Sequence, residues 1–523
     1  MKNKKKEIII IAIILILQSI IYIICGFNKQ YIHMDEAYSL GLASYDKVEI
    51  QDNEDFYNTW HDKSYYEDYL SVQEDEIGQY KQVYENQKND VHPPLYYLFL
   101  RFAMEFTKGH YSIWSGVILN IIIYIFITIF TYLIVKKLLS GQERLEEKAA
   151  ILTFISSITM ASLTTVLYIR MYALSALNIL ITTYLHMKLQ DQNHVNFKLL
   201  VCIGLSALVG SLTHYYYLFF LAMMFLIFVI RYIKEKNWKQ LSSYIITIAI
   251  AAIASLAIFP YSINHMFFGY RGQGVLSKLT DVSQFITNIA GYLSKTNYYI
   301  FNNLLLGIII AFICIIIYKR NKNTLKTIQV SPYTKLIELP TLFYFVIVAV
   351  ASPWIELRYI MAIESLIFIL VIYYLYELLK TFIEGKTCNI IIGIVLIAIL
   401  ISPAIFKIEP ESMYSDKKEI VKSLGNELNL PTIFLFNSNH NRFLDDILLF
   451  ATVDESYIAK DLDCTSDNIK TILDKKDISN GIIVFINAGQ NNDEELEVIK
   501  NTMNFKKWEW IKRLNACDVY YLH

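Results

Sequence analysis

The amino-acid sequence predicts a polytopic α-helical membrane protein with about 11 transmembrane helices and a C-terminal extracytoplasmic α/β domain. Three observations predict it. Long apolar blocks come first: 55% of the 523 residues are apolar and 18% are charged, against roughly 45–50% and 25% in soluble domains. Second, lysines and arginines gather in alternate connections between these blocks. Third, the composition turns polar after Pro403.

The charge balance and the cysteines exclude two other classes of protein. Lys and Arg number 47 and Asp and Glu number 48, a net charge of −1, so no global basic field attracts nucleic acid. The six cysteines stand singly, without the paired spacing that a zinc or redox site needs. We therefore expect neither nucleic acid nor a cysteine-bound metal as a partner.

The first membrane span is expected over Ile8–Gly26. Four lysines precede it and no small-residue cleavage site follows, which indicates a retained span with a cytoplasmic N-terminus. Residues 28–91 hold 15 acidic and 5 basic residues, too few positive charges for a cytoplasmic loop. The apolar stretch Leu95–Phe106 is shorter than the ~20 residues of a span, so we expect a re-entrant or surface-lying helix. Residues 28–112 thus form an outer loop with juxtamembrane helices.

Ten more apolar stretches complete a predicted set of eleven spans. They cover residues 113–135, 149–168, 171–187, 199–212, 215–230, 241–260, 299–318, 336–351, 359–379 and 389–406. With this count, the basic clusters within 136–148, 231–239 and 319–326 all fall on the side of the N-terminus, as the positive-inside rule requires. The sequence predicts a multi-pass protein of the plasma membrane whose C-terminal part lies outside.

A small α/β domain is expected over residues 410–523, after a transmembrane module over residues 1–409. Strand-like and helix-like patterns alternate in this region. The expected strands are Thr432–Phe436, Ser456–Ala459, Gly481–Ile486 and Asp518–Leu522, and the expected helices are 414–428, 441–451, 466–475 and 492–502.

Two adjacent carboxylates, Asp35 and Glu36, open the outer loop. Side chains of neighbouring residues point in different directions, so one carboxylate can act as a base while the other orients it or binds a metal ion. The pair could equally be two more solvated acids of an acidic loop. Their position at the lipid boundary, ahead of the other acidic residues, favours a role in chemistry.

Basic side chains are expected at the same face, near the outer ends of the spans. His92 precedes two prolines, Arg170 interrupts apolar sequence between two spans, and Arg358 stands at the start of a later span. A guanidinium group at that depth needs an anion, either a protein carboxylate such as Glu356 or a lipid phosphate.

Taken in order, these segments resemble those of membrane glycosyltransferases of the C type (GT-C). The similarity is to the glycosyltransferase family 39 and RgtA/B/C/D-like group, which is related to protein O-mannosyltransferases and to the lipid A aminoarabinose transferase. It covers about residues 7–410 and is carried by Asp35-Glu36, by His92-Pro93-Pro94-Leu95-Tyr96-Tyr97 and by Arg170-Met171-Tyr172-Ala173-Leu174. The ordered set of three motifs is more specific than any one of them.

The resemblance implies a sugar donor carried on a polyprenyl phosphate, transfer with inversion at the outer membrane face, and a cavity at the lipid boundary. Asp35 is then the expected base and Glu36 its support. The donor phosphate would be bound by His92, Arg170 and Arg358. His92 stands where the aminoarabinose transferase has lysine, so its charge depends on pH. The residues expected to line the cavity are Tyr96, Tyr172, His214 and Tyr215.

Cofactor and acceptor stay open at this point. A divalent cation could bridge the phosphate to Glu36, His92 or His214, and no other cofactor is expected. The expected partners are the donor lipid, the membrane, and an acceptor glycan, lipid or protein. The main alternative is a transporter, flippase or polymerase of lipid-linked glycans, which would carry its charges at the bilayer midplane. A non-enzymatic scaffold would leave Asp35 and Arg170 unexplained.

Overall fold

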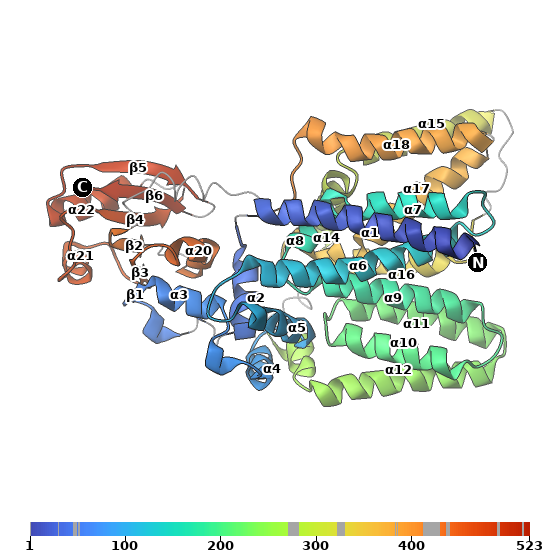
Figure 1. The fold of residues 1–523 in the computed structure, drawn as a ribbon, viewed down its shortest axis with the longest axis horizontal. Helices are drawn as coiled ribbons and strands as arrows, with labels where there is room; N and C mark the ends of the chain where they lie inside the picture. The colour runs from blue at the N-terminus through green and yellow to red at the C-terminus, as the bar shows by residue number, and fades with distance from the viewer. Residues whose placement is uncertain are drawn as a thin grey trace.

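The computed structural model describes residues 2–29, 31–44, 50, 53–269, 282–321, 330–381, 383, 385–411, 429–435, 440–488, 492–514 and 517–523. A bundle of long helices occupies one side of the molecule, and a sheet with short helices occupies the other (Figure 1). Between them lie the elements of the first outer loop (Figure 1).

The bundle begins with α1 (Lys2–Asn28). The outer loop follows, with α2 (Met34–Ser44), η2 (Glu54–Phe56), β1 (Trp60–Asp62), α3 (Lys63–Leu70), η3 (Glu74–Glu76), α4 (Tyr80–Asn89), α5 (Leu95–Met104) and η4 (Glu105–Thr107). The bundle then continues with α6 (Ile113–Leu138), α7 (Leu145–Ser157), α8 (Met160–Leu167), α9 (Tyr172–Gln190), α10 (Phe197–Ser211), α11 (Tyr217–Lys234), α12 (Trp238–Ile258), η5 (Asn264–Phe268), α14 (Val282–Lys295), η6 (Thr296–Ile300), α15 (Leu305–Asn321), α16 (Thr334–Ala351), η7 (Leu357–Tyr359), η8 (Met361–Ile363), α17 (Glu364–Lys380) and α18 (Gly385–Phe406).

Helices occupy the positions of the eleven predicted spans, but not all of them have the length and hydropathy of a membrane span. Seven helices of the described residues are long and apolar enough to cross a membrane, and up to nine spans result if two bent helix pairs, α7 with α8 and α14–η6 with α15, each count as one. The pairs are bent by 59° and 99°. The two other expected spans are α9, which is more polar, and α10, which has 15 residues. Within the bundle, α9 packs against α6, α10 and α11, and α10 also packs against α11 and α12 (Figure 1).

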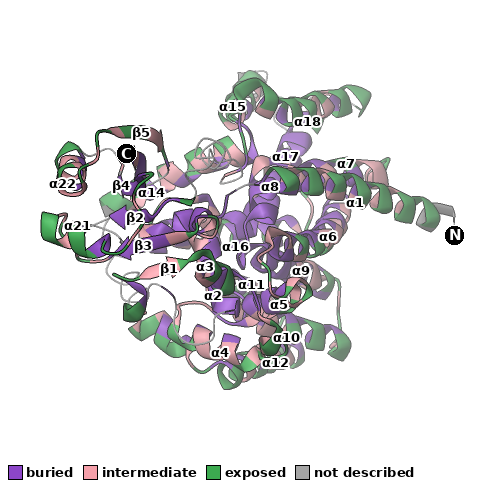
Figure 2. Ribbon diagram, turned by 60° about the vertical axis from the view of Figure 1, so that its left-hand side comes forward, coloured by how far each residue is buried: buried purple, intermediate pink, exposed green. Residues whose placement is uncertain are grey.

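The outer helices of the bundle present apolar side chains to their surroundings. Only 17% of the apolar window of α1, and the same share of α18, is buried inside the protein, against 78% for Met361–Lys380. Figure 2 shows the difference as exposed outer helices around a buried interior. Large exposed apolar surfaces mark contact with a partner or a membrane, so these helices face lipid.

The basic helix ends lie together at the end of the bundle that holds the N-terminus (Figure 1). Lys6 pairs with Glu147 at the start of α7 at 2.6 Å, and Lys136 at the end of α6 pairs with Glu7 at 2.5 Å. The outer-loop helices and the sheet lie at the opposite end of the bundle (Figure 1). The basic loops, which the sequence places on one side of the membrane, therefore lie at one end of the bundle, and the sheet lies at the other.

A six-stranded mixed sheet has the order β1-β3-β2-β4-β6-β5. Strand β2 is parallel to β3 and β4, and the other pairs are antiparallel. The elements of this region are β2 (Thr432–Leu435), η10 (His440–Asp446), α20 (Ile447–Phe450), β3 (Glu455–Ala459), α21 (Ser466–Ile472), β4 (Ile482–Asn487), α22 (Asp493–Met503), β5 (Trp508–Arg513) and β6 (Cys517–Leu522). The four expected strands and three of the expected helices are present, and the expected helix 414–428 lies outside the described residues.

The sheet takes its edge strand β1 from the first outer loop. Trp60 of β1 lies opposite Tyr457 of β3, and its indole Nε1 donates to the main-chain oxygen of Ile472 at 2.9 Å. The Tyr66 hydroxyl in α3 lies 2.6 Å from Ser456 Oγ. One hydrophobic core runs from the bundle through Tyr66 to one face of the sheet. A second core, with Trp60 and Ile472, lies on the other face and is covered by α21 and α22.

Candidate active site

Asp35 lies in the first turn of α2, close to the C-terminal end of α1. Its carboxylate forms an ion pair with Arg358 Nη1 at 2.5 Å and accepts a hydrogen bond from the Tyr168 hydroxyl at 3.0 Å. The Asp35 side chain keeps 19% of its surface exposed. Three segments that are far apart in the sequence therefore meet at one accessible carboxylate.

Arg170 stands between α8 and α9 and is almost entirely buried. Its Nη1 donates to the main-chain oxygen of Asp35 at 2.6 Å and to Ser39 Oγ at 3.1 Å. Its Nε is buried and has no hydrogen-bond partner among the described residues. A buried donor without an acceptor costs free energy.

The two guanidinium groups control the ionisation of Asp35. Burial raises the pKa of its carboxyl. The positive charges of Arg170 and Arg358 act in the opposite direction, as do His33 and the hydrogen bond from Tyr168, and together they outweigh burial. The pKa of Asp35 therefore lies well below its usual range, and the group is a carboxylate near neutral pH.

Glu36, the second carboxylate, is enclosed by protein. Its side chain is fully buried, and Lys29 Nζ lies 3.0 Å from it. The main-chain amides of His33 and Ile169 also donate to it, at 2.8 and 2.9 Å. Ile169 directly precedes Arg170, so Glu36 fixes the chain segment that carries this guanidinium. Because both oxygens are occupied, a role for Glu36 as a metal ligand does not fit this geometry.

His92 pairs with an acid that the sequence analysis did not single out. Its Nδ1 lies 2.8 Å from Asp90 Oδ2. The amide of Leu95, at the start of α5, donates to the main-chain oxygen of Leu212 at 3.1 Å, which holds the His-Pro-Pro motif against the turn that carries His214. The spacing Asp-x-His directly before the two prolines was a signal that could have identified Asp90.

Both imidazoles of this region are held neutral. Burial lowers the pKa of His92, although Asp90 acts in the opposite direction. Burial also lowers the pKa of His214 to about 3, and His92 and Arg170 add to the effect. When Nδ1–H donates to Asp90, the Nε2 of a neutral His92 is an acceptor, which suits a hydroxyl group better than a phosphate. The expected phosphate contact of His92 thus requires its protonation.

Of the four residues expected to line a cavity, Tyr172 and His214 lie near the acid and the arginines. The ring centroid of Tyr172 is 6.0 Å from that of Tyr168 and 5.5 Å from that of His214. His214 is in turn 6.3 Å from His92. These aromatic rings connect the Asp35 side of the site to the His92 side.

The other two tyrosines brace the surrounding structure. Tyr96 is fully buried and donates to Asn120 Oδ1 at 3.2 Å. The Tyr215 hydroxyl lies 2.9 Å from His265 Nδ1. Both hydroxyl groups are thus engaged within the protein, and the structure does not bring these two residues into contact with Asp35.

Within the described ranges, no group of three or more His, Cys, Asp or Glu side chains could hold a metal ion. A cation that bridges the donor phosphate to one of Glu36, His92 or His214 stays a prediction. Glu356, considered as a partner for an arginine, instead pairs with Lys295 at 3.2 Å.

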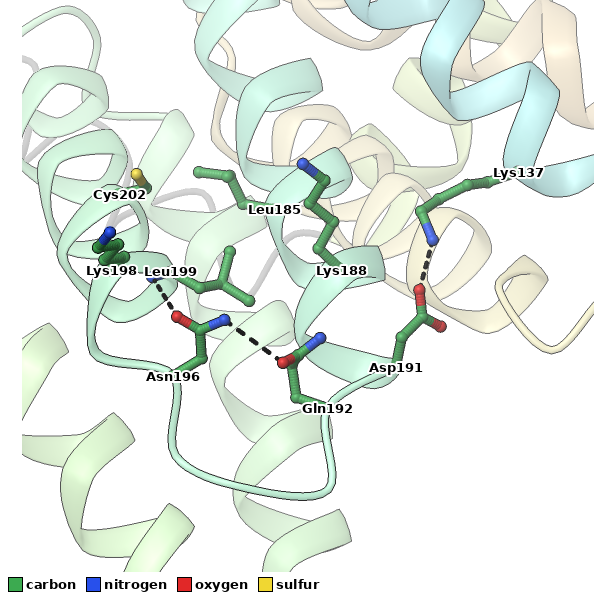
Figure 3. A pocket seen from close by; sticks show the side chains of 9 residues that line it. All are labelled: Lys137, Leu185, Lys188, Asp191, Gln192, Asn196, Lys198, Leu199 and Cys202. Carbon is green, nitrogen blue, oxygen red and sulfur yellow. Dashed lines mark hydrogen bonds and ion pairs between the residues drawn. The ribbon is translucent and has the colours of Figure 1, made fainter.

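A pocket of about 540 Å³ lies at the opposite end of the bundle, between the ends of α9 and α10 (Figure 3). Its lining includes Lys137, Lys188 and Lys198. Lys137 pairs with Asp191 at 2.5 Å, and the Tyr333 hydroxyl donates to the same carboxylate at 2.6 Å. Lysines at this end of the bundle are those that the positive-inside rule requires, and we assign the pocket no part in the chemistry.

Comparison with known proteins identifies the fold. No family model and no curated protein matches the chain. Among solved structures, ArnT from Cupriavidus metallidurans bound to undecaprenyl phosphate matches with a TM-score of 0.50 and 9% identity, over 98% of this chain and 97% of that one. Apo ArnT matches at 0.44 and 10%, over 97% of both chains. The Archaeoglobus fulgidus oligosaccharyltransferase tethered to an acceptor peptide matches at 0.38 and 11%, over 96% of this chain and 74% of that one. This chain is a multi-pass membrane protein with a GT-C-like fold, similar along almost its whole length to ArnT.

Proposed function

We propose that this chain is a membrane glycosyltransferase that moves a sugar from a polyprenyl-phosphate-linked donor to an acceptor hydroxyl at the outer face of the plasma membrane. The observation that carries the proposal is the Asp35 carboxylate paired with Arg358 at 2.5 Å, with the buried Arg170 bound to the main chain of the same residue. Transfer from a phosphate ester to a hydroxyl needs a base and fixed cations close to each other. The similar ArnT structure holds undecaprenyl phosphate, an anion of the required class.

Arg170 and Arg358 bind the donor phosphate in the proposed reaction. As the bond between the anomeric carbon and the phosphate oxygen breaks, the electron pair stays with the phosphate and its negative charge grows. Guanidinium groups already held in place stabilise that charge without reorganisation. The leaving polyprenyl phosphate therefore needs no general acid.

The acceptor hydroxyl attacks the anomeric carbon from the opposite side, which inverts its configuration, and its proton passes to Asp35. Before the donor binds, Arg358 is paired with Asp35. A phosphate competes for the same guanidinium group, and a weaker ion pair raises the basicity of the carboxylate. Donor binding thus prepares the base.

The remaining polar groups position the substrates and the two arginines. Glu36 holds the backbone before Arg170, and we assign it a positioning role in place of a catalytic one. Neutral His92, oriented by Asp90, offers an acceptor to a hydroxyl group of the sugar or of the acceptor. Tyr172 stacks beside this region.

The proposal includes the orientation of the molecule. By the positive-inside rule, the basic end of the bundle faces the cytoplasm, and Asp35 at the other end then faces outward. Residues 1–409 form the transferase module in this scheme, and residues 410–523 form an outer domain.

Release of polyprenyl phosphate separates the transferase from a transporter or flippase of lipid-linked glycans, which would leave the donor intact. The purified protein is mixed with a panel of polyprenyl-phosphate-linked hexoses and pentoses and with a membrane extract that supplies acceptors. Mass spectrometry should detect polyprenyl phosphate with the wild type and much less with Asp35→Asn. Donors that stay intact but cross a vesicle bilayer would support the flippase.

A further inference from the structure

Asp445 connects the C-terminal region to the first outer loop at one buried point. It lies in η10, which packs against α2, and only 2% of its surface is exposed. Its Oδ1 accepts hydrogen bonds from the main-chain amide of Met34 at 3.0 Å and from the Tyr31 hydroxyl at 2.9 Å. Met34 is the first residue of α2, so a side chain 411 positions away supplies an acceptor at the start of this helix.

An acceptor at this place caps α2 from outside the helix. The first amides of a helix have no partner within it, and negative charge is favoured at this end of the helix dipole. His33 Nδ1 accepts from the amide of Asp35 at 3.0 Å, and Asp445 accepts from the amide of Met34. The first turn that carries Asp35 is therefore held by two side chains, one of them from η10.

The support behind Asp445 is itself well packed. Arg442 Nη1 lies 3.2 Å from Asp445 Oδ2. Phe443, in the same short helix, lies 5.0 Å from Phe56 of the outer loop, measured between ring centroids, and both rings are fully buried. Movement of η10 would therefore disturb a packed core as well as the cap.

We infer that Asp445 is a positioning residue: it fixes the start of α2 and thereby the carboxylate of Asp35 against Arg170 and Arg358. The inference rests on the proposed function for its catalytic meaning. It gives the C-terminal region a part in the reaction without contact to substrate. The region after the last span thus supports the active site by holding the start of α2, on the side away from the substrate.

Three variants of the full-length protein test the cap. Asp445→Ala removes the acceptor, and Asp445→Asn keeps an oxygen for the amide and the hydroxyl. Arg442→Ala removes the ion pair at Oδ2 and leaves the contacts of Oδ1 in place. If Asp445→Ala does not yield folded protein, Asp445→Ser, whose side chain is too short to reach Met34, takes its place.

Hydrogen exchange gives a readout that needs no activity. Amides at the start of α2 should exchange about tenfold faster in Asp445→Ala, the change that loss of one hydrogen bond produces. Exchange in Asp445→Asn and Arg442→Ala should stay close to that of the wild type. Unchanged exchange at α2 in Asp445→Ala overturns the inference, whatever the activity of the variant.

Transfer kinetics then test the consequence for the reaction. In Asp445→Ala, kcat should fall at least about tenfold while KM for the donor stays within about twofold, because the arginines still bind the phosphate. Asp445→Asn should recover most of kcat. An equal kcat in Asp445→Ala, with faster exchange at α2, overturns the positioning of Asp35. If the wild type transfers no sugar but α2 exchanges faster in Asp445→Ala, the proposed function fails and the structural cap stands.

Discussion

Asp35 carries a carboxylate that two guanidinium groups keep ionised, and its amide analogue removes the charge at constant shape. Asp35→Asn keeps an oxygen that can accept from Tyr168 but cannot take a proton from a hydroxyl. We expect turnover to fall by about 10² to 10⁴, the usual contribution of a positioned base. Asp454→Asn, in an exposed pair with Lys63, is the matched control and should transfer sugar normally. Near-wild-type turnover of Asp35→Asn would assign the base to another residue.

The depressed pKa of Asp35 also predicts how stability depends on pH. Burial alone would raise this pKa, but Arg170 and Arg358 lower it well below its value of about 3.9 in the unfolded chain. A group of this kind contributes stability that is present above its unfolded pKa and is lost as the pH falls through its folded pKa. The unfolding temperature of the wild type should therefore fall more steeply below about pH 4 than that of Asp35→Asn. Parallel curves would contradict the depressed pKa.

The sequence identifies residues of the site when each departs from its surroundings. Asp35, Arg170 and Arg358 are charged residues beside apolar segments, and the structure brings all three together. Lys29 and Asp445 could not be found in this way. Each is one charged residue among several in a polar stretch, and its importance comes from a burial that only tertiary contacts create.

At the scale of elements, Glu36 and Lys29 form a buried ion pair that supports the start of α2. Glu36→Gln leaves the Lys29 ammonium group buried without a counter-charge, which costs roughly 3–5 kcal/mol. We expect a large drop in the unfolding temperature of the purified variant. The double variant Lys29→Met/Glu36→Gln should recover part of it, because no uncompensated charge remains.

Lys63→Met is the control for this pair. Lys63 belongs to an exposed ion pair, and such pairs contribute about 0–1 kcal/mol, so its loss should change stability little. If Glu36→Gln is as stable as Lys63→Met but inactive, Glu36 takes part in catalysis and our assignment of a positioning role is wrong.

Regular elements were predictable where a hydropathy pattern persists, and were missed where it is short or bent. The four strands with apolar runs were found, whereas β1 has three residues in an acidic loop and β5 alternates apolar with charged residues at a sheet edge. The span expected over 149–168 is two helices. The Thr159 side chain accepts a hydrogen bond from the amide of Ser162 and caps the start of α8. Mean hydropathy does not detect such a capping contact.

At the scale of the whole molecule, the basic residues lie at one end of the helix bundle and Asp35 lies at the other. We therefore expect the basic end to face the cytoplasm and the Asp35 end to face outward. Lys475, with 90% of its side chain exposed, lies in the C-terminal region, and exposed Lys236 follows α11 at the basic end. In a background without native cysteines, Lys475→Cys should react with an impermeant reagent in intact cells. Lys236→Cys should react only after the membrane is opened. The reverse pattern would invert the orientation and place the site in the cytoplasm.

The fold class was predictable because apolar blocks and basic loops are properties of the whole chain. The GT-C-like arrangement expected from the ordered motifs is the one observed. The joining of the outer loop to the C-terminal sheet was not predictable, since it depends on the pairing of β1 with β3, about 395 residues apart in register and without any local signal.

The central claim is that Arg170 binds the phosphate of the donor lipid. The most direct test measures the affinity of wild-type and Arg170→Ala protein for a polyprenyl phosphate, together with the unfolding temperature of the same preparations. Hydrogen bonds to a charged group contribute about 1.5–3 kcal/mol, so Arg170→Ala should bind the lipid roughly 10- to 100-fold more weakly in nanodiscs. The protein should remain folded. Arg170→Lys should recover only part of the affinity, because an ammonium group cannot reproduce the planar guanidinium. Unchanged lipid affinity in a folded or destabilised Arg170→Ala protein would contradict the phosphate site and the glycosyltransferase built on it.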